Sequence, residues 1–314
     1  MKRPISILLI SYIMILTACQ DHKDILCPGQ EPHRVDISFE WDKASEANPD
    51  GMTLYFYSDN GESYRFDIAG REGGPVELPV GQYHMVAYNN DVPTIDISDA
   101  QSFQTIKAEA RHIKGKNFLS SAGMLYETTI NRIEVTPCGV EYTREDGTVK
   151  ECNQSLIRCH PDSITSIYSL VVNNVSGIGN VKKASATIKG IASGQYLSDH
   201  HPFGVSSESY FPLSVDISNG MFTGKGGAFP SNGKDMTYSL DIIVTLTDGT
   251  SYVKDFDITQ QVVNSKYPHN VLIVINGLGI PDSGKPSPPG GGDISVDVEG
   301  WEVIEIDINS DISI

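Results

Sequence analysis

Basic residues are scarce in this sequence, and so are signatures of catalysis. The 314 residues include 23 Lys and Arg against 40 Asp and Glu, which gives a formal net charge of −17. Nucleic acid and anionic lipid head groups repel so acidic a body, so we expect no nucleic-acid partner. No G-x-S-x-G, H-E-x-x-H, Walker or dinucleotide-binding motif occurs in a supporting context. We therefore expect no cofactor and no enzymatic activity.

A membrane-spanning helix is also missing from the start of the chain. Lys2 and Arg3 precede an apolar run from Ile5 to Leu16, and the small residues Thr17 and Ala18 follow it. The run is much shorter than the ~20 apolar residues that a spanning helix needs. Its basic, apolar and small-residue order predicts a secretory signal peptide at residues 1–18.

The signal ends in Leu16-Thr17-Ala18-Cys19, which resembles the bacterial lipobox. The resemblance implies that Cys19 is acylated, with palmitate among its chains, and that a peptidase cuts before it. Two or more acyl chains hold a protein stably on a bilayer. We expect outer-membrane lipid as the partner of Cys19, because the acidic stretch Gln20–Asp24 resembles the tags of surface-exposed outer-membrane lipoproteins. Loss of Lys2 and Arg3 would take the net charge from −17 to −19.

Four more cysteines remain after Cys19 in a chain that passes through an oxidising space: Cys27, Cys138, Cys152 and Cys159. An even number favours disulfides, and four cysteines allow three pairings. A zinc site built from Cys138, Cys152, Cys159 and His160 is the alternative. The intervals lack the close C-x₂₋₄-C pairs that zinc sites favour, so we prefer disulfides.

Alternation of apolar and polar residues dominates the first half, which is typical of half-buried strands. An Asn60-Gly61 turn between Leu54–Tyr57 and Tyr64–Ile68 predicts a hairpin. The stretch containing Phe103, Ile106, Ala110 and Ile113 fits a helix as well as it fits strands. Other expected strands are Val35–Phe39, the pair Val76–Leu78 and Tyr83–Tyr88, Ile95–Ile97, Leu125–Thr129 and Arg132–Thr136.

The second half shows the same kind of strand pattern, with a turn at Asp248-Gly249. Many short strands separated by turns predict an all-β sandwich or barrel. We expect β-sandwich domains at 33–160 and 161–280, after a lipid-anchored tether at 19–32. The expected strands are Ser166–Val172, Ser185–Lys189, Leu213–Ile217, Tyr238–Thr247, Ser251–Ile258 and Val271–Ile275.

A Pro/Gly-rich linker at 281–292 precedes a C-terminal β-strand segment at 293–314. Eight of the eleven even-numbered positions from 294 to 314 are apolar, whereas only Trp301 and Val303 are apolar at the odd ones. A period of two gives an extended strand one apolar face, which must pair with its own domain or with another molecule. The candidate strand-donating residues are Ile294, Val296, Val298, Ile304, Ile306 and Ile308.

Three other patterns suggest sites, and each has a simpler interpretation. His200-His201 lies in a segment typical of a solvated loop. Asp307-x-Asn309-x-Asp311 begins like a calcium loop but lacks its central Gly and final Glu, so we expect no metal. A group of tyrosines could stack on sugars, although aromatic residues are common in strands for packing reasons; its members are Tyr55, Tyr57, Tyr64, Tyr83 and Tyr88.

The chain resembles the fimbrillin-associated anchor and minor fimbrial subunit lipoproteins of type V pili, including members with uncharacterised domains. The resemblance lies in Leu16–Cys19, His33–Trp41, Gly51–Tyr57, Leu78–Tyr83, Tyr88–Asn90, Ala186–Gly190, Val244–Gly249 and His269–Ile275. It implies two tandem transthyretin-like (Greek-key) β-sandwich domains in subunits that join by exchange of β-strands. Shaft subunits of such pili are trimmed after Arg, and this sequence offers no clear site for that cleavage.

Two functions follow from these expectations. The first is a surface-exposed outer-membrane lipoprotein that anchors or forms an accessory part of a fimbria-like fibre, with fimbrial or related envelope subunits as partners. The segment 293–314 would then donate a strand to a partner or lie back on its own domain. The alternative is a surface lipoprotein that binds glycans or another ligand through its tyrosines.

Overall fold

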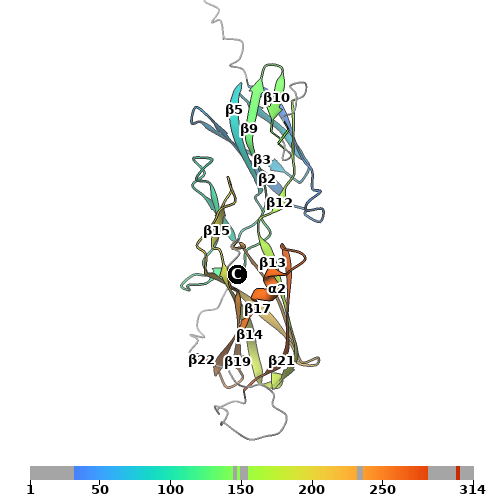
Figure 1. The fold of residues 1–314 in the computed structure, drawn as a ribbon, viewed down its shortest axis with the longest axis vertical. Helices are drawn as coiled ribbons and strands as arrows, with labels where there is room; N and C mark the ends of the chain where they lie inside the picture. The colour runs from blue at the N-terminus through green and yellow to red at the C-terminus, as the bar shows by residue number, and fades with distance from the viewer. Residues whose placement is uncertain (1–31, 144–146, 149–154, 232–235, 282–301, 305–314) are drawn as a thin grey trace, which may run out of the picture.

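The computed structural model describes residues 32–143, 147–148, 155–231 and 236–281, and the backbone of 302–304. It is built almost entirely of strands, and the described part contains only a 3₁₀ turn, η1 (Ile178–Asn180), and one short helix, α2 (Thr259–Val263). Two sandwiches lie end to end along the long axis of the molecule (Figure 1). The expected all-β fold class is confirmed. The leader, Cys19, Cys27, Cys152 and the Pro/Gly linker beyond Pro281 lie outside the described residues.

The strands of the first half, in chain order, are β1 (His33–Phe39), β2 (Gly51–Ser58), β3 (Ser63–Ala69), β4 (Gly73–Leu78), β5 (Gly81–Asn89), β6 (Ile95–Ser98), β7 (Lys107–Ala110), β8 (Leu119–Ser120), β9 (Tyr126–Thr136), β10 (Gly139–Tyr142), β11 (Leu156–Cys159) and β12 (Asp162–Ser163). A three-stranded sheet, β11-β1-β4, faces the sheet β10-β9-β5-β2-β3. Alternate residues of both sheets, including Val35, Ile37, Leu54, Phe56 and Met85, form a buried core between them. This is the packing that period-two strands require.

The strands of the second half are β13 (Ser166–Ser176), β14 (Val181–Ile191), β15 (Gly194–Tyr196), β16 (Pro202–Phe203), β17 (Ser207–Asp216), β18 (Met221–Ala228), β19 (Ser239–Leu246), β20 (Ser251–Asp257), β21 (Asn270–Gly279) and β22 (Glu302–Ile304). All of these strands except β15 and β16 form one continuous path, β21-β13-β18-β17-β14-β19-β20-β22. The path folds over at β17, whose first part pairs with β14 and whose last part pairs with β18.

Both halves repeat one seven-strand order, apart from the added edge strands β10 and β22 and the short strands β6, β7, β8, β12, β15 and β16. The last strand lies beside the first and parallel to it, and the first lies beside the fourth: β11-β1-β4 in one half and β21-β13-β18 in the other. In the facing sheet the neighbouring strands are the third, second, fifth and sixth of the seven along the chain. These are β3-β2-β5-β9 in the first half and β17-β14-β19-β20 in the second. The tandem Greek-key arrangement implied by the family resemblance is therefore present in the strand order of both halves.

A small sheet joins the two halves, because strands from each contribute to it. Its order is β16-β15-β7-β6, so β7 from the first half pairs antiparallel with β15 from the second. In addition, β8 pairs with β17 and β12 pairs with β9. The hydrophobic core of the second half accordingly includes Ile95, Ile106 and Leu125 from the chain between β5 and β9. The two halves are interlocked rather than joined by a single linker.

The structure settles one ambiguous segment and corrects two details of the strand predictions. The segment from Phe103 to Ile113 contains the strand β7 and no helix. Leu125–Thr129 and Arg132–Thr136 belong to one long strand, β9. The expected pairing of Val76–Leu78 with Tyr83–Tyr88 is wrong, since β4 pairs with β1 whereas β5 pairs with β2 and β9. The turn between them crosses from one sheet to the other.

Candidate functional site

The edge of β20 that faces away from β19 is the candidate site, because a segment of the C-terminal tail pairs with it. Strand β22 lies antiparallel to β20, with Ser251 opposite Ile304, Tyr252 opposite Val303 and Val253 opposite Glu302. In the first half the equivalent place, beside β9, is taken by β10 of the adjoining hairpin. In the second half the chain between β20 and β21 forms α2 instead, so the tail supplies the extra strand from a distance.

Pairing of the tail with its own domain was one of the two expected arrangements. Ile304 is the only candidate strand-donating residue that the structure describes, and it lies in β22. Ile294, Val296, Val298, Ile306 and Ile308 lie outside the described residues. The three paired positions of β22 show that the tail sequence can add a strand to a sheet of this type.

The opposite edge of the same sheet, β21, is closed by a side chain. The amide of Gln261, in α2, donates to the carbonyl oxygen of Val274 at 3.2 Å and accepts from its N–H at 2.8 Å. These two bonds replace those of a neighbouring strand at this position. Unpaired strand edges promote association with other chains, and natural proteins cover them. Gln261 therefore occupies the edge of β21 at Val274, whereas a strand of the tail occupies the edge of β20.

Packing accounts for the tyrosines, as the simpler interpretation predicts: three are buried in the cores, and Tyr55 and Tyr64 are partly buried against them. Tyr57, Tyr83 and Tyr88 are buried, and the ring of Tyr55 stacks on both Tyr57 and Tyr88, with centroids 5.8 and 6.4 Å apart. Burial raises the pKa of Tyr83 to about 12, because it disfavours the charged phenolate. The Arg65 guanidinium lies 5.8 Å from the centroid of the Tyr55 ring, so Tyr55 too is engaged in contacts within the protein. No observation on the described residues favours the glycan-binding alternative.

The expectation of disulfides is not supported at the two cysteines that the structure describes, Cys138 and Cys159. Both residues carry free thiols: Cys138 is exposed in the turn between β9 and β10, whereas Cys159 ends β11 with its side chain in the core. Burial raises the pKa of the Cys159 thiol, so it stays protonated. A zinc site is not supported either, because the described residues hold no group of three His, Cys, Asp or Glu side chains placed to bind a metal.

A cleft of about 380 Å³ lies where β5 ends and β9 begins. Asn89 at its wall donates to Asp91 Oδ1 at 2.7 Å and to the Met124 carbonyl at 3.2 Å, and its own Oδ1 accepts from the Tyr126 N–H at 2.7 Å. These bonds hold two chain segments together, so the polar groups of the cleft serve the fold.

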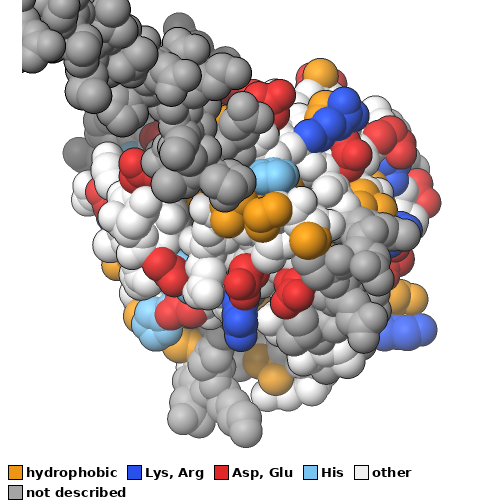
Figure 2. Space-filling model, turned by 90° about the horizontal axis from the view of Figure 1, so that it is seen from above, with side chains coloured by type: hydrophobic (Ala, Val, Ile, Leu, Met, Phe, Trp, Pro, Cys, Tyr) orange, Lys and Arg blue, Asp and Glu red, His pale blue; other side chains and the backbone are white. Residues whose placement is uncertain are grey.

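Figure 2 shows Asp and Glu spread over one end of the molecule, with Lys and Arg among them and no single acidic patch.

His200 makes a contact that sequence reasoning missed. Its Nε2 lies 2.7 Å from Oε2 of Glu127, a carboxylate on β9 that is only 2 % exposed. The single hydroxyl hydrogen of Thr129 has two acceptors within reach, Oε1 of Glu127 and the Leu197 carbonyl oxygen at 2.9 Å. The hydrogen bond with Glu127 raises the pKa of His200 above its usual value, against the effect of partial burial. The pair ties β9 of the first half to the β15–β16 loop of the second.

This pair predicts a pH dependence of stability. Because the pKa of folded His200 is raised, its contribution is fully present below the unfolded pKa of about 6.5 and disappears as the pH rises through the folded value. The imidazole is half exposed, so we expect a loss of about 1 kcal/mol or less. Urea unfolding of the wild type at rising pH should show the loss, which His200→Gln should remove. His201→Gln is the matched control, and an unchanged pH dependence in His200→Gln would contradict the assignment.

Tandem Greek-key sandwiches, the second of which pairs with a strand of the tail, define this chain as a two-sandwich all-β protein. The chain belongs to the family described as Domain of unknown function (DUF5119), which matches residues 18–211. No helix in the described part of the chain is long and apolar enough to cross a membrane.

A curated relative and two solved structures support the resemblance drawn from the sequence. The putative fimbrium anchoring subunit Fim4B of Bacteroides ovatus is 29 % identical over 136 residues, which is 41 % of this chain and 40 % of the relative. The match thus spans two fifths of the relative's length. A putative adhesin from Bacteroides ovatus has a TM-score of 0.62 at 21 % identity, covering 86 % of this chain and 98 % of the other. The fimbrial anchor protein Mfa2 from Porphyromonas gingivalis has a TM-score of 0.52 at 12 % identity, covering 77 % and 90 %.

The two solved structures show a shared fold, and the curated relative confirms the resemblance to fimbrial anchor and minor subunits. All three proteins carry names of fimbrial or adhesion components, and none of the three is named as an enzyme.

Proposed function

We propose that this chain is a lipid-anchored outer-membrane protein, exposed at the cell surface, that anchors or forms an accessory part of a fimbria-like fibre by β-strand complementation. Its relative Fim4B is named as a putative fimbrium anchoring subunit. The tail of the present chain adds a strand at the β20 edge. That pairing is the observation on which the proposal mainly rests. The chain acts by contact rather than by catalysis.

Strand addition suits this role because main-chain hydrogen bonds give affinity and alternate side chains set the register. The tail has the alternation that this requires, over a stretch far longer than the three paired residues of β22. In this proposal β22 marks the edge at which strands join, and residues 293–314 pair there or at the corresponding edge of a fibre subunit. The lipid on Cys19 holds the assembly to the membrane.

Deletion of residues 293–314 tests the role of the tail. We expect the body to stay folded, since the core of the second half is formed by β13–β21, and we expect co-purification with fibre subunits to be lost. Circular dichroism would report folding, and purification from cell envelopes would report assembly. As a matched pair, Ile306→Asp with Ile308→Asp should act like the deletion, whereas Asp307→Ser with Asn309→Ser should not. Normal co-purification of the deletion variant would sink the strand-complementation proposal.

Labelling with a radioactive fatty acid tests the anchor. Label should enter the wild-type chain and a Cys27→Ser control, and Cys19→Ser should lose it and leave the membrane fraction, because a chain without acyl groups has no hydrophobic anchor. A Cys19→Ser chain that remains labelled and membrane-bound would contradict the lipid attachment at Cys19.

A further inference from the structure

The strand through which the chain enters each sandwich lies beside the strand through which it leaves. In the first half β1 pairs parallel with β11, and in the second half β13 pairs parallel with β21. In a parallel pair the start of the first strand and the end of the last strand lie at opposite ends of the ladder. A pull on the two ends of either sandwich therefore acts along its ladder.

Such a pull loads all hydrogen bonds of the ladder at once. The bonds of a parallel ladder are evenly spaced along the strands, so sliding one strand past the other breaks them together. A pull that separates the two strands at one end breaks them one after another. The rate of forced unfolding depends on the barrier to this first rupture, which is higher for the sliding geometry.

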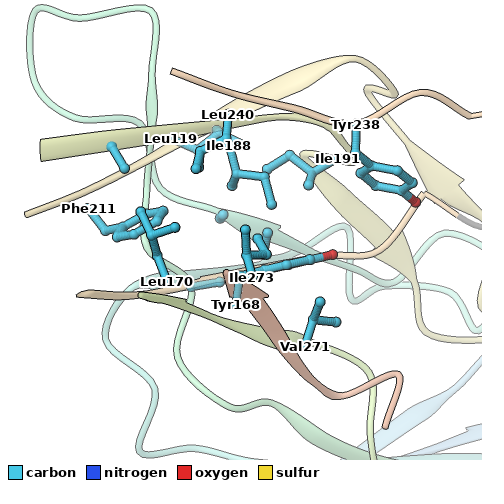
Figure 3. Packing of buried hydrophobic residues seen from close by; sticks show 14 of the residues in the cluster. Leu119, Tyr168, Leu170, Ile188, Ile191, Phe211, Tyr238, Leu240, Val271 and Ile273 are labelled. Carbon is cyan, nitrogen blue, oxygen red and sulfur yellow. The ribbon is translucent and has the colours of Figure 1, made fainter. Parts of the chain in front are cut away.

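The ladder of the second half is long and is held on one face by the core. Nine residue pairs connect β13 and β21, from Ile167 opposite Asn270 to Ser176 opposite Gly279. The side chains of Tyr168, Leu170 and Ile273 point toward residues of the opposite sheet (Figure 3). Sliding of β21 would pull Ile273 and the other buried side chains of β21 out of their packing as well as break the ladder. The Gln261 bonds to Val274 hold the other side of β21.

The ladder of the first half is shorter and carries side-chain bonds beyond its end. Four residue pairs connect β1 and β11, from Asp36 opposite Leu156 to Phe39 opposite Cys159. Immediately after them, Glu40 forms an ion pair with Arg158, and Asp42 Oδ1 lies 2.9 Å from His160 Nδ1. The Glu40 N–H also donates to the Cys159 carbonyl oxygen at 2.8 Å, so backbone and side-chain contacts both extend the connection beyond the four residue pairs.

The junction between the halves is also bonded across. Antiparallel pairing of β7 with β15 and parallel pairing of β8 with β17 connect the two halves. The Glu127–His200 pair adds a contact of 2.7 Å. Hydrogen-bonded strand pairs therefore resist tension in the first sandwich, at the junction and in the second sandwich.

We propose that the chain is a tension-bearing element in which two parallel terminal-strand ladders, β1–β11 and β13–β21, act as shear clamps in series. This inference rests on the proposed function, in which the N-terminal end is held by lipid and the C-terminal end by a fibre. The partner it fits is one that pulls on the tail along the long axis of the molecule. The shorter β1–β11 ladder is the first to yield when both ends are pulled.

Single-molecule pulling on the soluble chain, residues 20–314, tests the second clamp. Handles attached by non-cysteine chemistry at Asp162 and Asn276 pull β13 and β21 past each other. Handles at Asp162 and Lys266 pull on the starts of both strands. These starts lie side by side, and the Ser166 hydroxyl donates to the Pro268 carbonyl at 2.8 Å between them. We expect the first geometry to need a several-fold larger unfolding force at the same loading rate.

Equal forces in the two geometries, or a smaller force in the first, would overturn the proposal. Both arms use the same folded protein, so a general loss of stability cannot imitate the difference. The measurement is also independent of assembly. A chain that shows the larger force but never co-purifies with fibre subunits would refute the proposed function alone, and the reverse result would refute the clamp alone.

Discussion

Replacing Phe211 by alanine should lower the free energy of unfolding by about 3–5 kcal/mol, the cost of removing a large aromatic ring from a core. Phe211 is completely buried on β17, where that strand faces the glycine-rich strand β18. A Cβ atom at Gly226 would lie only 2.3 Å from the Phe211 ring, so the ring fills the space that those glycines leave open. Loss of the ring would leave a cavity between the buried side chains of the core and the backbone of β18. Urea unfolding followed by fluorescence measures the loss.

Leu272→Ala provides the control for this prediction. Leu272 is 58 % exposed on β21, so its truncation removes an apolar side chain of similar kind without making a cavity. We expect a change within about 0.5 kcal/mol. Equal effects of Phe211→Ala and Leu272→Ala would contradict the tight packing of the Phe211 ring against β18.

Replacing Gly194 by alanine should weaken the pairing of β15 with β7, which connects the two halves. A Cβ atom at this position would lie 2.2 Å from the Ala108 carbonyl oxygen and 2.5 Å from the Phe203 ring, so β15 would have to move away from β7. We expect a loss of about 1–3 kcal/mol, as for other overpacked sites. Hydrogen exchange should become faster in β7 and β15 while the outer strands keep their protection.

Gly179→Ala is the matched control, since a Cβ atom there meets nothing within 4 Å. Its hydrogen exchange should match that of the wild type. Unchanged protection of β7 and β15 in Gly194→Ala would show that the pairing of these strands does not hold the halves together.

Local patterns predicted most strands but not the pairing between distant ones. The Asn60-Gly61 turn gave the β2–β3 hairpin because both its strands lie within a few residues of the turn. The pairing of β1 with β11 joins Asp36 to Leu156, and no local signal reports a partner so far along the chain. The same reason explains β7, whose stretch fits both periods and whose strand pairs with β15 of the other half.

For the candidate sites, too, the sequence predicted local features but not contacts between distant segments. Alternation along the tail predicted a strand segment without showing which edge it joins, and β22 supplies that edge for three residues. The contact between Glu127 and His200 depends on the joint between the halves, which the sequence does not reveal. The cysteine count favoured pairing of thiols, but Cys159 faces a core that the exposed Cys138 does not enter.

Purification of the chain from cross-linked native envelopes, followed by mass spectrometry, tests the central claim most directly. We expect fimbrial or related fibre subunits among the cross-linked proteins, with cross-links that join them to the β20 edge or to the tail. An envelope preparation in which the chain is abundant and cross-links only to itself and to unrelated membrane proteins would contradict its role as a fibre subunit.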